Sequence, residues 1–306
     1  MALAQPHPST ADAEVTTLPR AAPSARDLVA LTKPRLASLV LCTAAGGALL
    51  AGGRLRDASV ALALVGTTLA VAGAHVLNCW LERDLDARMH RTRGRPLPAR
   101  RVDPSVALAF GLGLSILSVP VLWVGVNALT GALGLVALLS YVAAYTPMKT
   151  RSPWALWVGA VPGALPPLMG YTAVTDAIAA PGLALFAVMF FWQLPHFLAI
   201  AVLGREDYAR AGVRTVLAEW GERSARWHTF LWTIPLVAAS LDPSLLARTG
   251  WLYPLTAGVL GGVFLGAGLH GLRARDLRRW ARREFLLSLL YLTGLFLALV
   301  VDHRAP

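Results

Sequence analysis

The segment PSVALAFGLGLSILSVPVLWVGVNALTGALGLVALLSYVAAYTPM, residues 104–148, contains 45 consecutive residues without a charged side chain. A transmembrane helix needs about 20 mostly apolar residues. The segment is therefore long enough for two membrane spans, with a turn expected near Pro120–Asn127. It predicts an all-α, polytopic membrane protein.

The composition of the whole chain agrees with this prediction. Of the 306 residues, 56% are apolar and 15% are charged, whereas a soluble domain carries about 25% charged residues. High apolar content with few charges excludes a disordered chain. The 2 cysteines are too few for a disulfide framework or a four-cysteine zinc site.

Further apolar segments fit the length of a membrane span. They are residues 36–53, 59–81, 153–174, 181–203, 227–241, 251–271 and 285–301. Together with the two spans in 104–148 they predict a bundle of about nine transmembrane helices. The segment 227–241 is short for a span.

The basic residues are concentrated in alternate loops. Arginine is frequent in residues 82–103, 204–226 and 272–284, and the intervening loops contain few arginines. Because cytoplasmic loops collect Lys and Arg, this pattern places the N-terminus in the cytoplasm and the C-terminus outside. The net charge of +11 then reflects topology and contact with anionic lipid, and nucleic acid is not an expected partner.

The start of the chain differs in composition from the rest. Residues 1–28 are rich in Ala, Pro and Ser and mix both charge signs, which predicts a disordered cytoplasmic tail before a transmembrane domain over residues 29–306. The tail lacks the acid-poor, amphipathic character of an organelle import sequence. We therefore expect a multi-pass protein of a bacterial cytoplasmic (inner) membrane.

An acidic motif lies at the cytoplasmic end of the span 59–81. Asn78, Glu82 and Asp86 are spaced i, i+4, i+8, so they share one face of a helix. Three oxygen-bearing side chains on one face suit Mg²⁺, which takes its remaining ligands from water or phosphate. Asp84 is off this face and joins the site only if the helix ends there. The alternative is an interfacial helix end whose acids balance nearby arginines.

Basic residues follow the acidic motif closely. The guanidinium groups of Arg91 and Arg95 can bind phosphate oxygens in a fork geometry. A site that binds a diphosphate through a metal ion is expected to have acidic residues followed by arginines along the chain. Lys149 and Arg151, at the end of the uncharged segment, are further candidates for phosphate binding, with positive-inside anchoring as the alternative.

A second polar group lies in the span 181–203. Gln193 and His196 fall within an apolar run, where polar groups are costly and are therefore functional candidates. Asp207 comes eleven residues after His196, which returns to nearly the same helix face if the helix continues through Gly204. The alternative for His196 is a hydrogen-bonded core residue.

The span 153–174 is rich in glycine and proline. Gly159 and Gly163 form a small-xxx-small pair, which predicts close helix packing. Pro166 and Pro167 are expected to break the helical hydrogen bonds, which is tolerated beside a cavity.

These motifs resemble those of the UbiA-type intramembrane prenyltransferases. Asn78-xxx-Glu82-x-Asp84-x-Asp86, followed by Arg91-Thr92-xx-Arg95-Pro96, is similar to the family's first aspartate-rich motif. Four further motifs resemble the haem-farnesylating branch. They are Tyr145-Thr146-Pro147-x-Lys149, Val158-Gly159-Ala160-x-Pro162-Gly163-Ala164-x-Pro166-Pro167-x-x-Gly170, Trp192-Gln193-x-Pro195-His196-Phe197 and Glu206-Asp207-Tyr208-xx-Ala211-Gly212. Glu82 departs from the usual Asp, and the second motif lacks the two spaced aspartates of other UbiA-type enzymes.

The resemblance implies an enzyme that transfers a farnesyl group from farnesyl diphosphate to a vinyl group of haem b, with addition of water, giving haem O and diphosphate. It implies Mg²⁺ as cofactor, the lipid bilayer as surroundings, and haem A synthase or terminal-oxidase assembly factors as partners.

The resemblance also implies which residues form the site. The implied catalytic residues are Asn78, Glu82, Asp84, Asp86, His196 and Asp207, and all of these except His196 would bind the metal. Arg91, Arg95, Lys149 and Arg151 are implied for the diphosphate, and His196, Gln193 and Tyr145 for haem. Three alternatives stay open: another UbiA-type aromatic prenyltransferase, a membrane transporter and a haem-delivery scaffold.

Overall fold

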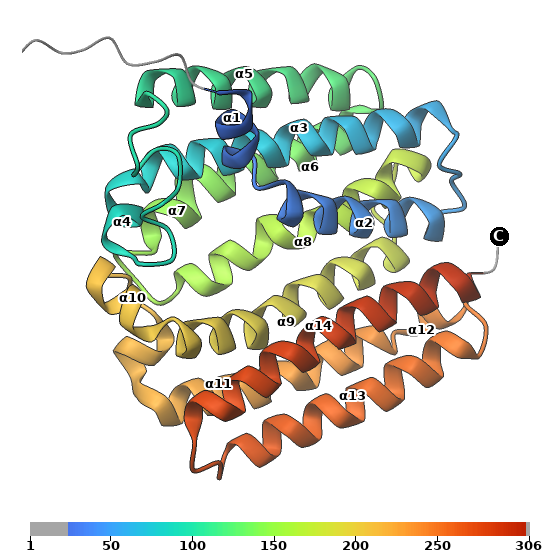
Figure 1. Ribbon diagram of the computed structural model, residues 1–306. Helices are drawn as coiled ribbons and strands as arrows, with labels where there is room; N and C mark the ends of the chain where they lie inside the picture. Colours follow the sequence, from blue (N-terminus) through green and yellow to red (C-terminus); the bar gives the residue numbers. More distant parts are fainter. Residues whose placement is uncertain (1–23, 304–306) are drawn as a thin grey trace, which may run out of the picture.

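A computed structural model describes residues 24–303, which form a bundle of helices (Figure 1). This confirms the all-α prediction. The elements are α1 (Ala25–Leu31), α2 (Pro34–Leu50), α3 (Ala58–Leu81), α4 (Arg83–Arg88), α5 (Pro104–Trp123), α6 (Ala128–Leu139), the π-helical turn η1 (Ser140–Tyr145), α7 (Thr146–Met148), α8 (Ala155–Thr175), α9 (Ala180–Leu203), α10 (Arg205–Ala211), α11 (Val216–Ser240), α12 (Pro243–Leu246), α13 (Leu252–Gly271) and α14 (Leu277–Asp302).

Each predicted membrane span coincides with a long helix. Within the described residues, 7 helices are long and apolar enough to cross a membrane, or 8 if α1 and α2, which meet at 51°, form one span. The remaining predicted span forms α8, whose 21 residues include prolines and glycines that lower its hydropathy. By length and composition the count is thus 7 or 8, below the nine expected from the sequence.

Several boundaries differ from the sequence expectations. The turn predicted near residues 120–127 is confirmed, because α5 ends at Trp123 and α6 begins at Ala128. The segment expected to be a short span belongs to α11, which begins earlier, at Val216, and bends at Gly221 (φ 80°). Most of the predicted tail lies outside the described residues, but its last residues belong to α1, which begins at Ala25.

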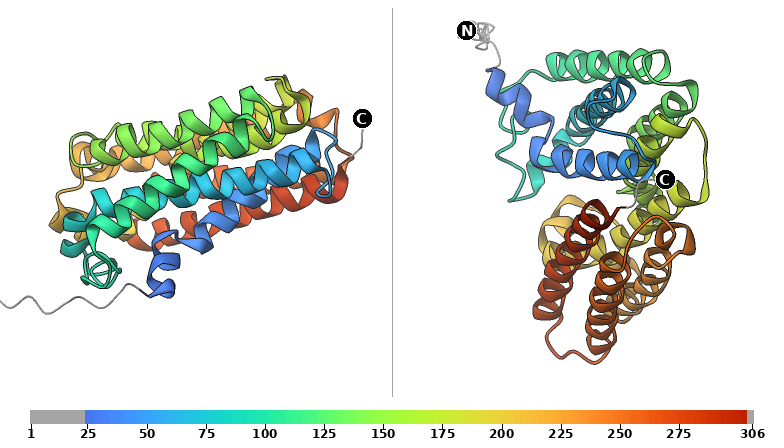
Figure 2. Two further views of the ribbon diagram at one scale, coloured as in Figure 1. Left: turned by 90° about the horizontal axis from the view of Figure 1, so that it is seen from above. Right: turned by 90° about the vertical axis from the view of Figure 1, so that its right-hand side faces the viewer.

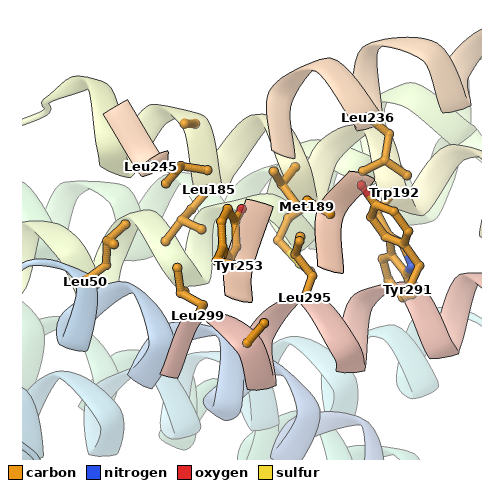
Figure 3. Packing of buried hydrophobic residues seen from close by; sticks show 14 of the residues in the cluster. Leu50, Leu185, Met189, Trp192, Leu236, Leu245, Tyr253, Tyr291, Leu295 and Leu299 are labelled. Atoms are coloured by element: carbon orange, nitrogen blue, oxygen red, sulfur yellow. The ribbon is translucent and has the colours of Figure 1, made fainter. Parts of the chain in front are cut away.

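The helices form two groups that meet along α8 and α9. Helices α2, α3, α5, α6 and α8 form one group and α9, α11, α13 and α14 the other, with α14 also packed on α2 (Figure 2). Tyr253, Tyr291 and Leu295 are fully buried in the core of the second group (Figure 3). The hydroxyl of Tyr291 donates to Ser240 Oγ at 2.7 Å, so the polar end of this ring is satisfied away from water.

Helices α2 and α8 approach each other at backbone distance. A Cβ atom on Gly47 would lie 1.9 Å from the carbonyl oxygen of Pro167, and one on Gly170 would lie 1.8 Å from that of Ala44. Such contacts replace hydrophobic burial as the source of helix association in lipid. The expected break at Pro166-Pro167 is not observed, because α8 continues through these residues.

The arginine-rich loops lie at one end of the bundle, opposite the end of α14 (Figure 1). Hydrogen bonds join these loops to one another. The amide of Arg214 donates to Lys149 O at 2.9 Å, and the amide of His90 donates to Asp207 Oδ1 at 3.0 Å. The basic loops therefore share one side of the bundle, as the alternation of charge predicted.

Candidate functional site

A cavity of about 180 Å³ opens at the end of the bundle where the basic loops gather. Its basic lining residues are Lys33, Arg91, Arg95, Lys149 and Arg214, and its acidic ones are Glu82 and Asp86. Five basic groups against two acidic ones leave an excess of positive charge. A cavity of this kind attracts anions.

The acidic motif lines this cavity across a bend between two helices. α3 ends at Leu81 and α4 begins at Arg83, yet the amide of Glu82 donates to Asn78 O at 2.9 Å and the amide of Asp86 to Glu82 O at 2.7 Å. The i to i+4 bonds thus continue through the bend. The structure therefore brings Asn78, Glu82 and Asp86 together, as their spacing predicted.

Asp84 points away from the cavity. Its side chain is 83% exposed and lies 3.9 Å from Nη2 of Arg83. The sequence predicts that Asp84 joins the site only if the helix ends at this point. The helical hydrogen bonds continue past Glu82, so Asp84 stays off the face that lines the cavity.

Basic side chains from distant segments contact the acidic motif. Nζ of Lys33 donates to Oδ1 of Asn78 at 2.9 Å, and Nδ2 of Asn78 donates to Oγ1 of Thr146 at 3.2 Å. Nζ of Lys149 lies 2.7 Å from Oε1 of Glu82. These contacts orient the amide and the carboxylate.

Asp86 is the most deeply buried acid of the motif, at 1% exposure. Nη1 of Arg95 donates to its two oxygens at 2.9 and 2.7 Å. Thr92 Oγ1 donates to the backbone oxygen of Asp86 at 2.8 Å, which holds the loop that carries Arg95. A buried carboxylate is tolerated only with such a partner.

Lys33 is a residue of this site that the sequence analysis did not single out. It lies between α1 and α2 in the left-handed region, at φ 52°. The adjacent carbonyl of Thr32 is 3.0 Å from Nδ1 of His75, so α3 holds the break between the two helices. The available signal was a lysine followed by Pro34 at the start of the first span, where it resembles an ordinary positive-inside charge.

Lys149 is surrounded by tyrosines as well as by Glu82. Its Nζ lies 4.5 Å from the ring centre of Tyr145, a ring that has space because Gly159 opposite it has no side chain. Burial opposes the positive charge, but Tyr145, Glu82 and Tyr141 outweigh it and raise the pKa of Lys149 above its usual value. Lys149 is therefore a cation at neutral pH. Arg151 is exposed and lies outside the cavity lining.

Gln193 lies between α9 and α8 rather than in this cavity. Its Nε2 donates to the carbonyl oxygens of Ala160 and Met189, each at 3.1 Å. A Cβ atom on Gly163 would lie 2.1 Å from Gln193 Oε1. Gly159 and Gly163 thus make room for two polar side chains, Tyr145 and Gln193, and not for a backbone contact between helices.

His196 packs between α9 and α14. Its ring stacks on Trp192 and Phe285 at centroid distances of 4.6 and 5.1 Å, and its Nδ1 lies 2.7 Å from Ser288 Oγ. It is outside the cavity, although the next residue, Phe197, lines it. The geometry is that of a hydrogen-bonded core histidine.

Asp207 also lies outside the cavity lining. It accepts hydrogen bonds from the amides of His90 at 3.0 Å and Arg91 at 3.4 Å, and it pairs with Arg210. The Arg210 hydrogen bond, with those of the two amides, lowers the pKa of Asp207. Asp207 faces the loop after α4, whereas His196 faces Ser288 on α14, so the two side chains do not meet.

The oxygen atoms of the acidic motif are of the ligand type that Mg²⁺ prefers. Among residues 24–303, no group of three or more His, Cys, Asp or Glu side chains is placed to hold a metal ion, and the acidic motif offers two carboxylates and an amide. Oε1 of Glu82 is buried and lies 2.7 Å from Nζ of Lys149, and a carboxylate oxygen keeps a second lone pair for a further ligand. Mg²⁺ commonly binds through one or two carboxylates plus substrate phosphate.

Comparison with known proteins places most of the chain in one family. Residues 39–290 match the UbiA prenyltransferase family. A protoheme IX farnesyltransferase of Myxococcus xanthus is 51% identical over 282 residues, covering 92% of this chain and 96% of that relative. One of Anaeromyxobacter dehalogenans is 50% identical over 295 residues, covering 96% of this chain and all of that relative.

Solved structures share the fold at lower sequence identity. A digeranylgeranylglyceryl phosphate synthase superposes with a TM-score of 0.77 at 16% identity, over 90% of this chain and 97% of that one. A UbiA homologue from Archaeoglobus fulgidus bound to GPP and Mg²⁺ gives 0.60 at 16% identity, over 90% and 99%. These likenesses confirm the fold.

Proposed function

This chain belongs to the UbiA prenyltransferase family, and from that membership we propose that it transfers a farnesyl group from farnesyl diphosphate to a vinyl group of haem b. The curated relatives that are 50–51% identical over more than nine-tenths of the chain are protoheme IX farnesyltransferases. The reaction adds water and gives haem O and diphosphate.

The observation that supports a diphosphate donor is the charge arrangement of the cavity. Asn78, Glu82 and Asp86 line one side, and basic groups from four other segments surround them. A diphosphate carries several negative charges that only a cation-rich pocket can hold away from bulk water. A site for a neutral substrate would not need five basic side chains around two acids.

Magnesium is the metal that the acidic motif suits. Asn78, Glu82 and Asp86 would hold it, and when bound the ion supplies positive charge to the diphosphate leaving group. The solved Archaeoglobus fulgidus homologue binds Mg²⁺ together with GPP, which supports this assignment. Asp84 and Asp207 are not part of the proposed ligand set, because both lie outside the cavity lining.

The protein's own residues then act on the leaving group. Arg91 and Lys149 would bind phosphate oxygens, and Arg95 and Lys33 would keep Asp86 and Asn78 oriented. The bond between C1 of the farnesyl group and oxygen breaks, and the electron pair leaves with the diphosphate. Fixed positive charge near this oxygen stabilises the transition state more than the ground state, because negative charge develops there.

The acceptor attacks the cation that remains. A vinyl carbon of haem forms the new bond to C1, and water adds to the resulting cation on the porphyrin side chain, with loss of a proton. Aromatic and apolar residues at the cavity wall, such as Tyr145, Phe197 and Leu198, would exclude water from C1 until the carbon–carbon bond has formed. For His196 and Gln193 we propose a role in fixing α9, the helix that carries Phe197.

The relatives are bacterial, and we place the chain in the cytoplasmic (inner) membrane with α4 and α10 on the cytoplasmic side. Arginines in the loops at that end support this orientation. Farnesyl diphosphate is water-soluble at its charged end, so a cavity that opens toward the cytoplasm suits its delivery.

The test uses membranes that contain the full chain, incubated with haem b, farnesyl diphosphate and Mg²⁺, with and without EDTA. Extracted haems are analysed by mass spectrometry. A metal-dependent gain of one farnesyl group plus one water is the expected result, and membranes carrying Glu82→Gln are the matched control. No new haem from folded protein supplied with both substrates and metal would overturn the proposal, and other aromatic acceptors would then be screened.

A further inference from the structure

Helix α10 connects the two groups of helices beside the cavity. It packs on α9 and α11 of the second group, yet it also contacts α4, which continues from α3 of the first group. Figure 1 shows α10 next to α4 at the end of the bundle where the basic loops gather. The connection is polar, and its centre is the carboxylate of Asp207.

Asp207 accepts hydrogen bonds from two successive backbone amides that are more than one hundred residues away in sequence. These are the amides of His90 at 3.0 Å and Arg91 at 3.4 Å. Both follow directly after Met89, where the backbone becomes extended at the end of α4. Two adjacent amides bound to one carboxylate fix the direction in which the chain leaves α4.

The next residue of α10 contacts the side chain of the same arginine. The guanidinium carbon of Arg91 lies 4.7 Å from the ring centre of Tyr208, within the range of a cation–π interaction. Asp207 thus fixes the backbone of Arg91 while Tyr208 supports its side chain. Both Arg91 and Tyr208 line the cavity, whereas Asp207 lies behind them.

Arg91 differs from the other basic residues of the cavity. Lys33, Lys149 and Arg95 contact Asn78, Glu82 and Asp86 respectively, and Arg214 lies 3.6 Å from Glu219. Within residues 24–303, the Arg91 guanidinium makes no hydrogen bond or ion pair with another side chain, and its contact is the ring of Tyr208. It is therefore available for an anionic ligand without breaking an existing ion pair.

We propose that Asp207 is a positioning residue that holds Arg91 at the cavity so that its guanidinium meets the diphosphate of the donor, and that it is not a metal ligand. This inference rests on the proposed function for the identity of the donor. The ionised state of Asp207, favoured by Arg210, strengthens both amide hydrogen bonds. Loss of the carboxylate frees the loop after α4 and costs diphosphate affinity through Arg91 alone.

The experiment measures binding of inorganic diphosphate and of farnesyl diphosphate to the purified full chain in detergent, by titration calorimetry in the presence of Mg²⁺. The variants are Asp207→Ala, Arg91→Ala, the double variant and Asp207→Asn. Asp276→Ala is the matched control, since Asp276 also accepts a backbone amide, that of Arg279 at 2.9 Å, but lies outside this cavity lining. Thermal unfolding of each variant checks that it is folded.

Each single variant is expected to weaken diphosphate binding by roughly tenfold, the scale of one hydrogen bond to a charged group. The double variant should bind within about twofold of Arg91→Ala, because the two residues act as one unit. Asp207→Asn, which keeps an acceptor oxygen, should recover part of the loss, and the Mg²⁺ concentration for half-maximal binding should not move.

Two results would overturn the inference. One is a further tenfold loss of diphosphate affinity when Asp207→Ala is added to the Arg91→Ala variant. The other is a shift in the Mg²⁺ requirement caused by either Asp207 variant, which would make Asp207 a metal ligand. If Asp207→Ala does not fold, Asp207→Asn in the two backgrounds gives the same comparison. A third result is that Asp207 and Arg91 act as one unit in diphosphate binding while the protein does not farnesylate haem. That result would support the inference and reject only the proposed acceptor.

Discussion

Nζ of Lys33 lies 2.9 Å from Oδ1 of Asn78, although 45 positions separate the two residues. The contact joins the break between α1 and α2 to the last turn of α3. It orients the amide so that its oxygen faces the same cavity as Glu82 and Asp86. A cation at the first membrane helix is thereby part of the candidate active site.

Replacement of Lys33 by Gln should raise the KM for farnesyl diphosphate about tenfold, since a hydrogen bond to a charged group is worth on the order of 1.5–3 kcal/mol. Steady-state kinetics with each substrate varied in turn measures this effect. Arg35→Gln is the control, because Arg35 lies only two residues further on and is exposed. An equal rise in KM for haem would contradict a role confined to the donor side.

Loss of charge at Glu82 should lower activity strongly, whereas loss of charge at Asp84 should change it little. Glu82→Gln keeps the side-chain volume but removes a proposed metal ligand and leaves Lys149 unpaired, so kcat/KM should fall by roughly 100-fold or more. Asp84→Asn should stay within about twofold, because that side chain is 83% exposed. Activity at saturating Mg²⁺ distinguishes the two, and equal losses would mean that the helix unwinds at Glu82 when substrate binds.

Removal of metal should abolish activity without destabilising the fold. Glu82 and Asp86 pair with Lys149 and Arg95, so cations of the protein itself compensate their charges. We expect EDTA to leave the unfolding temperature in detergent unchanged and added Mg²⁺ to restore turnover. A marked drop in unfolding temperature with EDTA would indicate that the metal is structural.

Close packing between α2 and α8 should make Gly170 intolerant of a methyl group. Its Cβ would lie 1.8 Å from the backbone oxygen of Ala44, and backbone cannot move aside as a side chain does. Gly170→Ala should destabilise the protein by about 1–3 kcal/mol. Gly262→Ala, in α13 with nothing near the added atom, should be close to neutral, and unfolding in detergent compares them.

Part of the candidate site could be predicted from local spacing. Asn78, Glu82 and Asp86 line one cavity because i, i+4 hydrogen bonds persist through the bend at Glu82, a property of the helix itself. Arg91, Arg95, Tyr145 and Lys149 also reach the cavity. The membrane spans followed from hydropathy because a bilayer demands long apolar helices whose backbone groups are satisfied internally.

The roles of Asp207, His196 and Lys33 depended on contacts between distant segments. Asp207 faces the loop after α4, His196 faces Ser288 on α14, and Lys33 faces Asn78 on α3. An acid, a histidine and a lysine next to a membrane have the same local signature whether they touch a ligand or support a neighbour. The sequence by itself determined a membrane-spanning helical bundle and predicted a metal-and-diphosphate motif, because both inferences depend on composition and helical period. The tertiary structure alone decided which polar side chains meet in the cavity, because that depends on how α10, α14 and the break after α1 pack against the bundle.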